Sequence, residues 1–380
     1  MSFLKKILIT ATVQSHICQF HKPLVEMLRE QGEVEIHVAA RNNLEEKNGL
    51  KLDFADRVFD VPFQRSPFSA KNLKAYRKLK KIIDENHYDY IHSNTPVGGM
   101  LTRIAARKCR SQGTRVLYTA HGFHFYKGAP RKNWIIYYPI ERFAARWTDA
   151  LITINAEDYA LAREKFNCPV FEIHGVGVSA ERYCPVTPEQ QGLLREKLGF
   201  RPDERLILCV GELLPNKNQQ MAVSAMEQVI QQFPNARLLL AGNGPQKETL
   251  EAQVRSRGLE KHVVFLGYCT NLEEYQQIAE IVLSCSRREG LPLNIIEAML
   301  SRNPVVATHN RGHDELVRDG ETGYLLQADD VDAMAQRLCA LFAQPDLADQ
   351  MGRQGLALAM CYTVPVVQEE LKKIYFGADR

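Results

Sequence analysis

Residues 279–297 read A-E-I-V-L-S-C-S-R-R-E-G-L-P-L-N-I-I-E, which is an apolar run, a polar turn and a second apolar run. The first run is short, continuous and apolar, as is typical of a strand buried on both faces of a parallel sheet. Pro292 suits the first turn of a helix, because its missing N–H would have no intrahelical acceptor there. The stretch therefore predicts a strand, a turn and a helix in succession.

The same alternation of strand and helix patterns runs through the chain on both sides of this stretch. Repeated strand–helix–strand units predict an α/β fold with parallel sheets and helices on both faces. Strands are expected at 6–12, 34–40, 89–92, 115–120, 149–154, 170–174, 205–211, 237–241, 262–267, 280–284, 304–307 and 323–326. Helices are expected between them, for example at 19–31, 71–86, 97–110, 219–232 and 246–257.

A polar, proline-containing stretch at 183–203 is interpreted as a linker. A length of 380 residues also favours two domains over one. The sequence therefore predicts two Rossmann-like, doubly wound parallel-sheet domains, 1–185 and 186–364, with a cleft between them.

Composition places the chain among ordinary globular proteins, with 45% hydrophobic and 24% charged residues. The nine cysteines are scattered and form no C-x-x-C pair, which predicts free thiols in a reducing compartment. No stretch of about 18 apolar residues is present to span a bilayer, and the first apolar run is too short for a signal peptide. A cytoplasmic protein is expected, one that is still able to touch a membrane surface.

Charge is distributed unevenly along the chain. Residues 65–150 hold 17 Lys and Arg against 5 Asp and Glu, whereas the remainder holds 31 against 40. A solvated surface is one explanation. The other is contact with a polyanion, whether anionic lipid, nucleic acid or a phosphorylated substrate.

Loops that follow strands are the places to search for a site, because open α/β sheets bind ligands beyond the carboxyl ends of their strands. In the quoted stretch, helix-start amides form a seat for a diphosphate, and Arg287 and Arg288 add positive charge. Glu289 and Glu297 then make sense as acceptors for sugar and ribose hydroxyls. The alternative is that Glu289 caps the helix and Glu297 is a surface residue. The amides in question belong to Leu291, Leu293 and Asn294.

Other post-strand loops offer further candidates. Residues 209–218 contain Lys217, a cation for phosphate, and residues 238–245 contain glycines that allow close backbone approach. Residues 264–271 end where a base can stack. In the first half the candidate loops are 10–16, 93–100 and 118–130.

Together these segments resemble a known family. E-G-L-P-L-N-I-I-E-A-M (289–299) carries the E-x7-E pattern of retaining nucleotide-sugar glycosyltransferases of family 4, which have the two-domain GT-B fold. The resemblance spans nearly the whole chain. It is closest to the branch that builds capsule or exopolysaccharide units on a polyprenyl-diphosphate lipid, because of H-G-F-H-F-Y-K-G-A-P at 121–130.

The resemblance implies that 186–364 is the donor domain. There Glu297 would hold the ribose hydroxyls, Glu289 would hold the donor sugar and Lys217 would meet the β-phosphate. The backbone of Tyr268 would contact the base. The helix-start loop would hold the diphosphate through Arg288, Gly290, Leu291, Leu293 and Asn294.

The resemblance also implies that 1–185 is the acceptor domain, with the helix at 365–380 packing back on it. His121 would meet the donor sugar near its reacting carbon. The loop with Ser15 and His16 would contact acceptor or phosphate. Three further cations fit an acceptor diphosphate or membrane phosphates, with a plain surface role as the alternative: Lys127, Arg131 and Lys132.

The chain departs from the family pattern at Glu212, where many members have Arg, and at Val13-Gln14, where paired glycines are usual. No metal or cofactor is expected. Asp330-Val331-Asp332 is better explained as a helix start than as a metal motif, and a metal pair at His309 and His313 is equally disfavoured.

The resulting expectation is a membrane-peripheral, metal-independent, retaining transferase. It would use a UDP-sugar, in a class that includes N-acetylhexosamines, and a lipid-linked acceptor. The alternatives are a soluble small acceptor, a UDP-sugar 2-epimerase of the same fold, and a basic binding module without activity. Nucleic acid is not an expected partner of the transferase.

Overall fold

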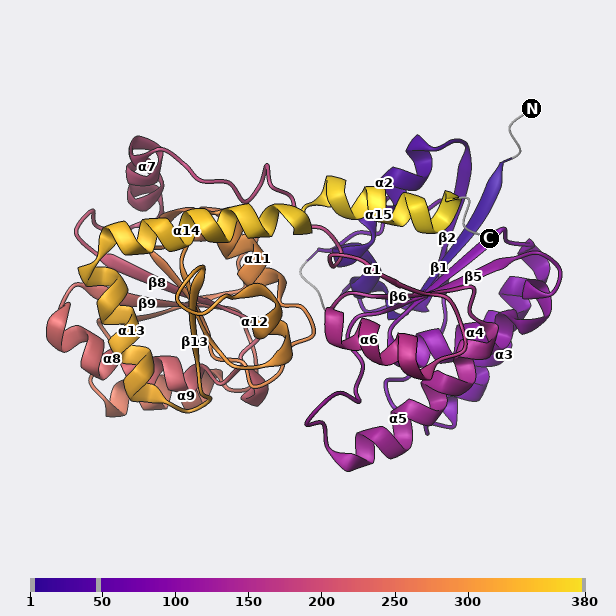
Figure 1. The fold of residues 1–380 in the computed structure, drawn as a ribbon, viewed down its shortest axis with the longest axis horizontal. Helices are drawn as coiled ribbons and strands as arrows, with labels where there is room; N and C mark the ends of the chain where they lie inside the picture. The colour runs from indigo at the N-terminus through magenta and orange to yellow at the C-terminus, as the bar shows by residue number, and fades with distance from the viewer. Residues whose placement is uncertain (1–3, 46–48, 378–380) are drawn as a thin grey trace. The chain divides into compact units, whose positions relative to one another are not determined.

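Two parallel sheets organise the residues that the computed structural model describes, 4–45 and 49–377 (Figure 1). The chain divides into a first unit, which runs up to Gly177 and resumes at Val364, and a second unit, Val178–Thr363. Each unit holds one sheet with helices packed around it. The predicted fold class, two doubly wound α/β units, is confirmed.

The sheet of the first unit has the order β3-β2-β1-β4-β5-β6-β7, and every neighbouring pair is parallel. The central strand β1 pairs through Ile7 with Ile36 on one side and with Tyr90 on the other. Its strands are β1 (Lys5–Val13), β2 (Val34–Arg41), β3 (Arg57–Asp60), β4 (Tyr90–Asn94), β5 (Arg115–Ala120), β6 (Ala150–Thr153) and β7 (Val170–Glu172).

The helices of the first unit cover this sheet and bury their apolar sides against it. A core cluster under α3 and α4 includes Leu79, Ile83 and Ala105, all nearly inaccessible to solvent. The helical segments are α1 (Gln14–Phe20), α2 (Lys22–Glu30), α3 (Lys71–Asn86), α4 (Pro96–Arg110), α5 (Arg131–Ala144), the 3₁₀ turn η1 (Ala145–Trp147), α6 (Ala156–Lys165) and α15 (Val364–Phe376).

The sheet of the second unit has the order β10-β9-β8-β11-β12-β13, again with parallel neighbours. In both sheets the chain first builds outward from a central strand and then reverses to build on its other side, as in nucleotide-binding doubly wound folds. The strands are β8 (Arg205–Val210), β9 (Ala236–Ala241), β10 (Val263–Gly267), β11 (Ile281–Ser284), β12 (Val305–Thr308) and β13 (Gly323–Leu326).

Core side chains fill both faces of the second sheet, which explains why its strands read as continuous apolar runs. The helical segments are α7 (Pro188–Leu198), the 3₁₀ turn η2 (Pro215–Lys217), α8 (Gln219–Gln232), α9 (Lys247–Ser256), α10 (Leu272–Ile278), α11 (Leu293–Leu300), α12 (Arg311–Leu316), α13 (Val331–Ala343), α14 (Pro345–Ala359) and the 3₁₀ turn η3 (Met360–Tyr362).

Two predictions about local structure are wrong. The stretch 183–203 is not a plain linker, because it contains α7, whose start is fixed by a reciprocal capping box between Thr187 and Gln190. The helix predicted at 19–31 is two helices, α1 and α2, which meet at His21. Pro23 lies in the first turn of α2, where its missing N–H costs nothing, so a new helix starts there.

The last helix, α15, belongs to the first unit, where it lies beside α2 (Figure 1). Gln368 donates from its side-chain Nε2 to the Pro23 carbonyl (2.9 Å), and the Tyr375 hydroxyl lies 2.7 Å from Nδ1 of His92. Arg115 donates to the Tyr375 carbonyl (2.7 Å). Tyr375 is fully buried, so this helix completes the core of the first unit.

Within the described ranges, no helix is both long enough and apolar enough to cross a bilayer. The cysteines, all of which lie in those ranges, are free thiols, as predicted.

Candidate functional site

The site of the second unit lies where its strand order reverses, between β8 and β11. Loops that leave the carboxyl ends of β8, β11 and β12 meet at this edge, which is where doubly wound sheets bind their ligands. The first loop carries Lys217, the second carries Glu289 and the third carries Arg311. The contacts among these three loops define the site.

Lys217 and Glu289 form an ion pair, with 2.6 Å between Nζ and Oε1. The two side chains are only 23% and 15% exposed, so their attraction is screened less than that of a surface pair. The structure thus joins two predicted site residues that lie 72 positions apart. The alternative for Glu289, a helix cap, is wrong: Pro292 holds the N-cap position of α11, and no described side chain caps it.

Backbone hydrogen bonds fix the two loops against each other. The amide of Arg287 donates to the Asn216 carbonyl (2.8 Å), and the Asn216 side chain donates to the Arg288 carbonyl (3.0 Å). The Asn294 side chain donates to the Val210 carbonyl (3.1 Å). The first turn of α11 is therefore tied to the end of β8, and the Lys217–Glu289 pair rests on a braced frame.

The start of α11 presents a positive end to this edge. The amides of the first turn, including those of Leu293 and Asn294, precede the intrahelical hydrogen bonds, and the Ile295 amide donates to the Pro292 carbonyl. That first turn contains no acidic residue to offset the helix dipole. Such a helix start attracts anionic oxygens.

The third loop was missed by the sequence analysis. Arg311 donates from Nε to the Glu289 carbonyl (3.3 Å). A Cβ atom added to Gly312 would lie 2.8 Å from Cβ of Glu289 and 3.0 Å from the Gly290 carbonyl oxygen, so only glycine allows this approach. Asn310 caps α12 by accepting from the amides of Gly312 and His313. A cap residue directly after a predicted strand was the available signal.

Glu297 is partly buried on α11, so the alternative that it is a plain surface residue is wrong. Burial raises its pKa to about 7, against the opposing effects of a hydrogen bond from Tyr183 and the nearby charge of Arg182. Arg182 is itself held by Glu273, which accepts two hydrogen bonds at 2.9 and 2.7 Å. Near neutral pH this carboxyl changes protonation state with small changes in its surroundings.

The remaining candidates of the second unit fall into place around this frame. Arg287, expected to add charge to the diphosphate seat, makes a bidentate pair with Asp329 (2.8 and 2.7 Å). Arg288 and Tyr268 are exposed, and Tyr268 retains 49% of its surface. The exposed Glu212 follows Gly211 at the end of β8.

Close backbone approach in the loop after β9, expected from its glycines, is confirmed at Gly242. Its φ is +144°, and an added Cβ would lie 2.1 Å from the Gly211 carbonyl oxygen. The two post-strand loops therefore touch through their backbones.

The residues judged to be structural have structural partners. The Asp330 carboxylate accepts from the Ala333 amide (3.0 Å) and caps α13, which confirms the predicted helix start. His313 uses both ring nitrogens, with Ser284 Oγ at 3.0 Å and the Thr308 carbonyl oxygen at 2.5 Å. His309 pairs with Asp314 (2.9 Å).

The site of the first unit lies at the matching place, where the strand order reverses between β1 and β4. His16 follows β1 on α1, and His121 follows β5. Their ring centroids lie 4.6 Å apart at an interplanar angle of 84°. Ser15 is buried and exchanges hydrogen bonds with Asn43 (3.1 and 2.9 Å), so its hydroxyl is already engaged.

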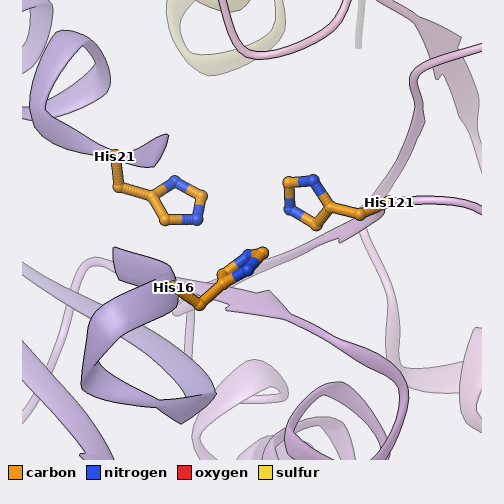
Figure 2. Close-up of side chains that lie close together, drawn as sticks. All are labelled: His16, His21 and His121. Carbon is orange, nitrogen blue, oxygen red and sulfur yellow. The ribbon is translucent and has the colours of Figure 1, made fainter. Parts of the chain in front are cut away.

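A third ring, that of His21, completes a cluster that sequence reasoning missed (Figure 2). Its centroid lies 5.4 Å from that of His16 and 5.9 Å from that of His121. The expected continuous helix at 19–31 concealed His21, because it placed this residue inside a regular helix. The break between helices α1 and α2 turns the His21 ring toward the other two rings instead.

Burial keeps the histidines of this edge neutral. It lowers the pKa of His16 to about 4 and that of His92 to about 3. It also lowers the pKa of His21 and His121 well below the ordinary value, and neighbouring histidines add to the effect. These four rings are therefore neutral near neutral pH, whereas the site of the second unit holds the Lys217–Glu289 ion pair.

The basic stretch 65–150 contains helices α3, α4 and α5 of the first unit. Lys127, Arg131 and Lys132 are exposed at the start of α5. On the same helix Ile135 is 74% exposed and Phe143 is 49% exposed. Some basic residues of the stretch are structural instead, such as Arg103, which is fully buried against Glu141.

The chain contains two doubly wound units. The second unit has a helix start and a lysine–glutamate pair where its strand order reverses. This architecture is that of the GT-B class of proteins. The family "Glycosyl transferase 4-like" matches residues 6–155, and "Glycosyl transferases group 1" matches residues 190–357.

Similar proteins span both units. EpsD of Bacillus subtilis (strain 168), provisionally described as a glycosyltransferase, is 43% identical over 373 residues, or 98% of this chain and 96% of its own. The UDP-Gal:alpha-D-GlcNAc-diphosphoundecaprenol alpha-1,3-galactosyltransferase of Escherichia coli is 28% identical, covering 76% and 75%. The structure of Anabaena Alr3699/HepE in complex with UDP superimposes with a TM-score of 0.78 at 20% identity, covering 98% and 99%. The chain therefore belongs to the group 1 and 4-like glycosyl transferases, and it resembles their exopolysaccharide branch.

Proposed function

We propose that the protein is a retaining glycosyltransferase of surface polysaccharide synthesis. It moves a sugar from a UDP-sugar to a polyprenyl-diphosphate-linked acceptor. The sugars proposed for transfer include N-acetylhexosamines. The observation that carries the proposal is the Lys217–Glu289 pair, 2.6 Å apart, beside the start of α11. The E. coli relative, named for a UDP-galactose donor and a diphosphoundecaprenol acceptor, supports the choice of substrates.

In this proposal the second unit binds the diphosphate of the donor. The β-phosphate takes Lys217 from Glu289, and the loop amides of Leu291, Leu293 and Asn294 donate to the phosphate oxygens. Glu289 is then free to accept hydrogen bonds from the sugar hydroxyls. Gly290 lets the phosphates approach the backbone, and the exposed Arg288 adds charge at the rim. Ligand binding thus exchanges one ion pair for two specific contacts.

The nucleoside half is held by Glu297 and by the backbone at Tyr268. Ribose hydroxyls donate to the Glu297 carboxylate, and this contact favours the ionised form of a group whose pKa in the free protein is about 7. The uracil base is read by the backbone at the end of β10.

The chemical step needs negative charge to be stabilised where it develops. The bond between the anomeric carbon and the β-phosphate oxygen breaks, and the acceptor oxygen bonds to the same face of that carbon. The acceptor proton passes to the departing phosphate oxygen, so no enzyme nucleophile is needed. Lys217 and the loop amides stabilise the leaving group as fixed donors. They fill the place of a metal, and no cofactor takes part.

In the first unit, His121 meets the donor sugar near its reacting carbon. As a neutral ring it accepts or donates a hydrogen bond without repelling the positive charge that develops there. The loop with Ser15 and His16 faces the acceptor.

Helix α5 and the loop before it hold the protein on the cytoplasmic face of the membrane as a peripheral protein. Lys127, Arg131 and Lys132 meet lipid phosphates or the acceptor diphosphate. The exposed Ile135 and Phe143 of α5 enter the interface beside them. An acceptor on a lipid carrier then reaches the enzyme by diffusion in two dimensions.

The donor is tested by thermal denaturation with a panel of UDP-, GDP- and ADP-sugars. A ligand at about one hundred times its Kd adds about 2.7 kcal/mol to stability, so the right donor raises Tm most. We expect a UDP-sugar to do so in the wild type and in Lys247→Ala, an exposed control on α9, but not in Lys217→Ala. A larger shift with a guanine or adenine nucleotide would overturn the donor assignment.

The acceptor is tested by following label from the donor in assays with and without polyprenyl-diphosphate sugars. Transfer to the lipid fraction is expected. Transfer only to a soluble sugar would establish the small-acceptor alternative. Conversion of UDP-GlcNAc to its 2-epimer without any acceptor would establish the epimerase.

A further inference from the structure

The histidine cluster of the first unit has the composition of a metal site. His16 comes from α1, His21 from the junction of α1 and α2, and His121 from the loop after β5 (Figure 2). One ring nitrogen of each lies within 4.8 Å of those of the other two. Three separate segments therefore bring three imidazole ligands to one point.

Two of these rings have a buried nitrogen without a hydrogen-bond partner. Nε2 of His16 and Nε2 of His21 are buried, and neither finds a hydrogen-bond partner among the described residues. The His21 side chain as a whole is only 4% exposed. Burying a polar atom without a partner costs stability, so such an atom calls for a function. His92, 6.3 Å from His21, shows the contrast, because both of its nitrogens are hydrogen-bonded.

The third ring is oriented as a metal ligand would be. Nε2 of His121 lies 3.0 Å from Oδ1 of Asn94, while the Asn94 amide nitrogen donates to the Thr10 carbonyl (3.3 Å). The Asn94 oxygen therefore faces the ring, and Nε2 of His121 donates to it. The lone pair is left on Nδ1, or on Nε2 after a half-turn of the ring. A hydrogen bond to the second nitrogen is the usual support of a ligating histidine.

A small cavity adjoins two of the three rings. It has a volume of about 20 Å³ and is lined in part by His21, His92 and His121, whereas His16 is not part of its lining. This volume suits a single water-sized species.

We propose that His16, His21 and His121 bind a divalent transition-metal ion of the zinc type. Imidazole nitrogens suit zinc and its neighbours, whereas Mg²⁺ and Ca²⁺ prefer oxygen ligands. Zinc–nitrogen bonds of about 2.0–2.1 Å place tetrahedral ligands roughly 3.3 Å apart, so the rings move inward by rotation when the ion binds. Three histidines leave a fourth position open for water or for a substrate oxygen.

The consequence for activity rests on the proposed function, because His121 is also the residue that meets the donor sugar there. An ion bound to this ring removes it from the sugar and occupies the edge that the acceptor approaches. Metal binding therefore inhibits transfer, and a chelator restores it. Site and activity are measured separately, so either proposal can fail without the other.

Binding is tested on the full-length protein after treatment with a chelator. Zn²⁺ is titrated against a chromophoric chelator, and Co²⁺ is added as a spectroscopic probe, since four-coordinate Co²⁺ absorbs visible light far more strongly than the hydrated ion. We expect one ion per chain. His21→Gln and His16→Gln should each weaken binding at least about tenfold, since even loss of an outer contact costs that much.

The control is His87→Asn, which removes an exposed histidine from the end of α3, where an αL backbone also suits asparagine. It should bind like the wild type. Circular dichroism checks that each variant is folded. If His21→Gln does not fold, His16→Gln provides the test of metal binding. Absence of stoichiometric binding by the wild type, or equal binding by all the variants, would overturn the site.

The inhibition is tested by the zinc concentration that halves transfer. In His21→Gln this concentration should rise by the same factor as the Kd. Binding without inhibition would remove only the regulatory consequence. A protein that binds zinc as expected but transfers no sugar would refute the proposed function and keep the site.

Discussion

The two units place their candidate sites at the same point of the same fold, but the chemistry of the two sites is opposite. At the edge of the first unit, His16, His21 and His121 are neutral rings, and two of them have a ring nitrogen with no hydrogen-bond partner among the described residues. At the edge of the second unit, Lys217 and Glu289 are charged and paired. The sheet topology fixes where a ligand sits, and the loops decide what kind of ligand it is. In the proposed function, the charged site meets the leaving diphosphate, and the neutral site meets the sugar.

The sharpest way to break this contrast is to remove the cation. Lys217→Ala should lower kcat about 10²–10³-fold, the cost of losing one fixed donor to a developing negative charge. Steady-state kinetics with the identified donor measure this, with Lys247→Ala as the surface control. In the double variant with Glu289→Ala, the losses should not add, because the two residues contact each other. A fall of less than about threefold would mean that the charge has no part in catalysis.

The braced frame of the second site can be tested without touching a charge. Gly312→Ala places Cβ 2.8 Å from Cβ of Glu289, so the loop must shift, and a loss of about 1–3 kcal/mol in unfolding free energy is expected. Denaturant unfolding measures the loss of stability, and the KM for donor measures the effect of the loop shift on donor binding. Gly192→Ala on α7 is the matched control: its Cβ meets no described atom within 4 Å, and it should stabilise by about 0.5–1 kcal/mol. Equal stability of both variants would show that Gly312 is not a packing constraint.

The titration of Glu297 sharpens the contrast further. Its folded pKa of about 7 lies above the ordinary 4.5, so the folded state holds this proton more tightly than the unfolded chain does. Its contribution to stability is full below about pH 4.5 and is lost as pH rises through 7. Donor binding has the opposite sign, because hydroxyls prefer the ionised acceptor. Affinity should rise about tenfold from pH 6 to 8 by calorimetry.

Glu297→Gln should abolish that rise, and the exposed Glu248→Gln should preserve it. An unchanged pH profile in Glu297→Gln would assign the dependence to another group.

The smallest expected effect for a single side chain concerns the surface of the first unit. Changing Lys127, Arg131 and Lys132 to serine should weaken pelleting with anionic vesicles by about fivefold per charge, corresponding to about 1 kcal/mol each. Ile135→Ser tests the apolar contribution separately. Lys247→Ser, in the other unit, is the control. Equal pelleting of all these proteins would remove the membrane role of α5.

Most of the framework was predictable from the sequence, because strands buried on both faces read as unbroken apolar runs. Each of the twelve expected strands overlaps a strand of the structure, while β3 (Arg57–Asp60) was missed. That strand lies at the sheet edge and is largely exposed, so R-V-F-D carries little apolar signal. Helix α7 was missed although T-P-E-Q at 187–190 is a capping pattern, because its weakly amphipathic sequence looked like a linker.

The site was predictable where a loop follows a strand and has a distinctive charge, as with Lys217 and Glu289. Contacts between distant loops were not. Nothing in the sequence couples Gly312 to Glu289, and nothing couples Arg287 to Asp329 across 42 residues. His21 was missed for a different reason, since its role depends on a helix break that the periodicity did not reveal.

The position of α15 has a consequence for the folding of the two units during translation. Val178–Thr363 is one uninterrupted length of chain, so the second unit can fold as soon as it has emerged. Most of the first unit is translated earlier, but its core stays incomplete until α15 is made, because Tyr375 accepts a hydrogen bond from Tyr90 and bonds His92. A premature stop after Thr363 would therefore damage the unit that was synthesised first, and a nascent chain would need protection there until α15 has emerged.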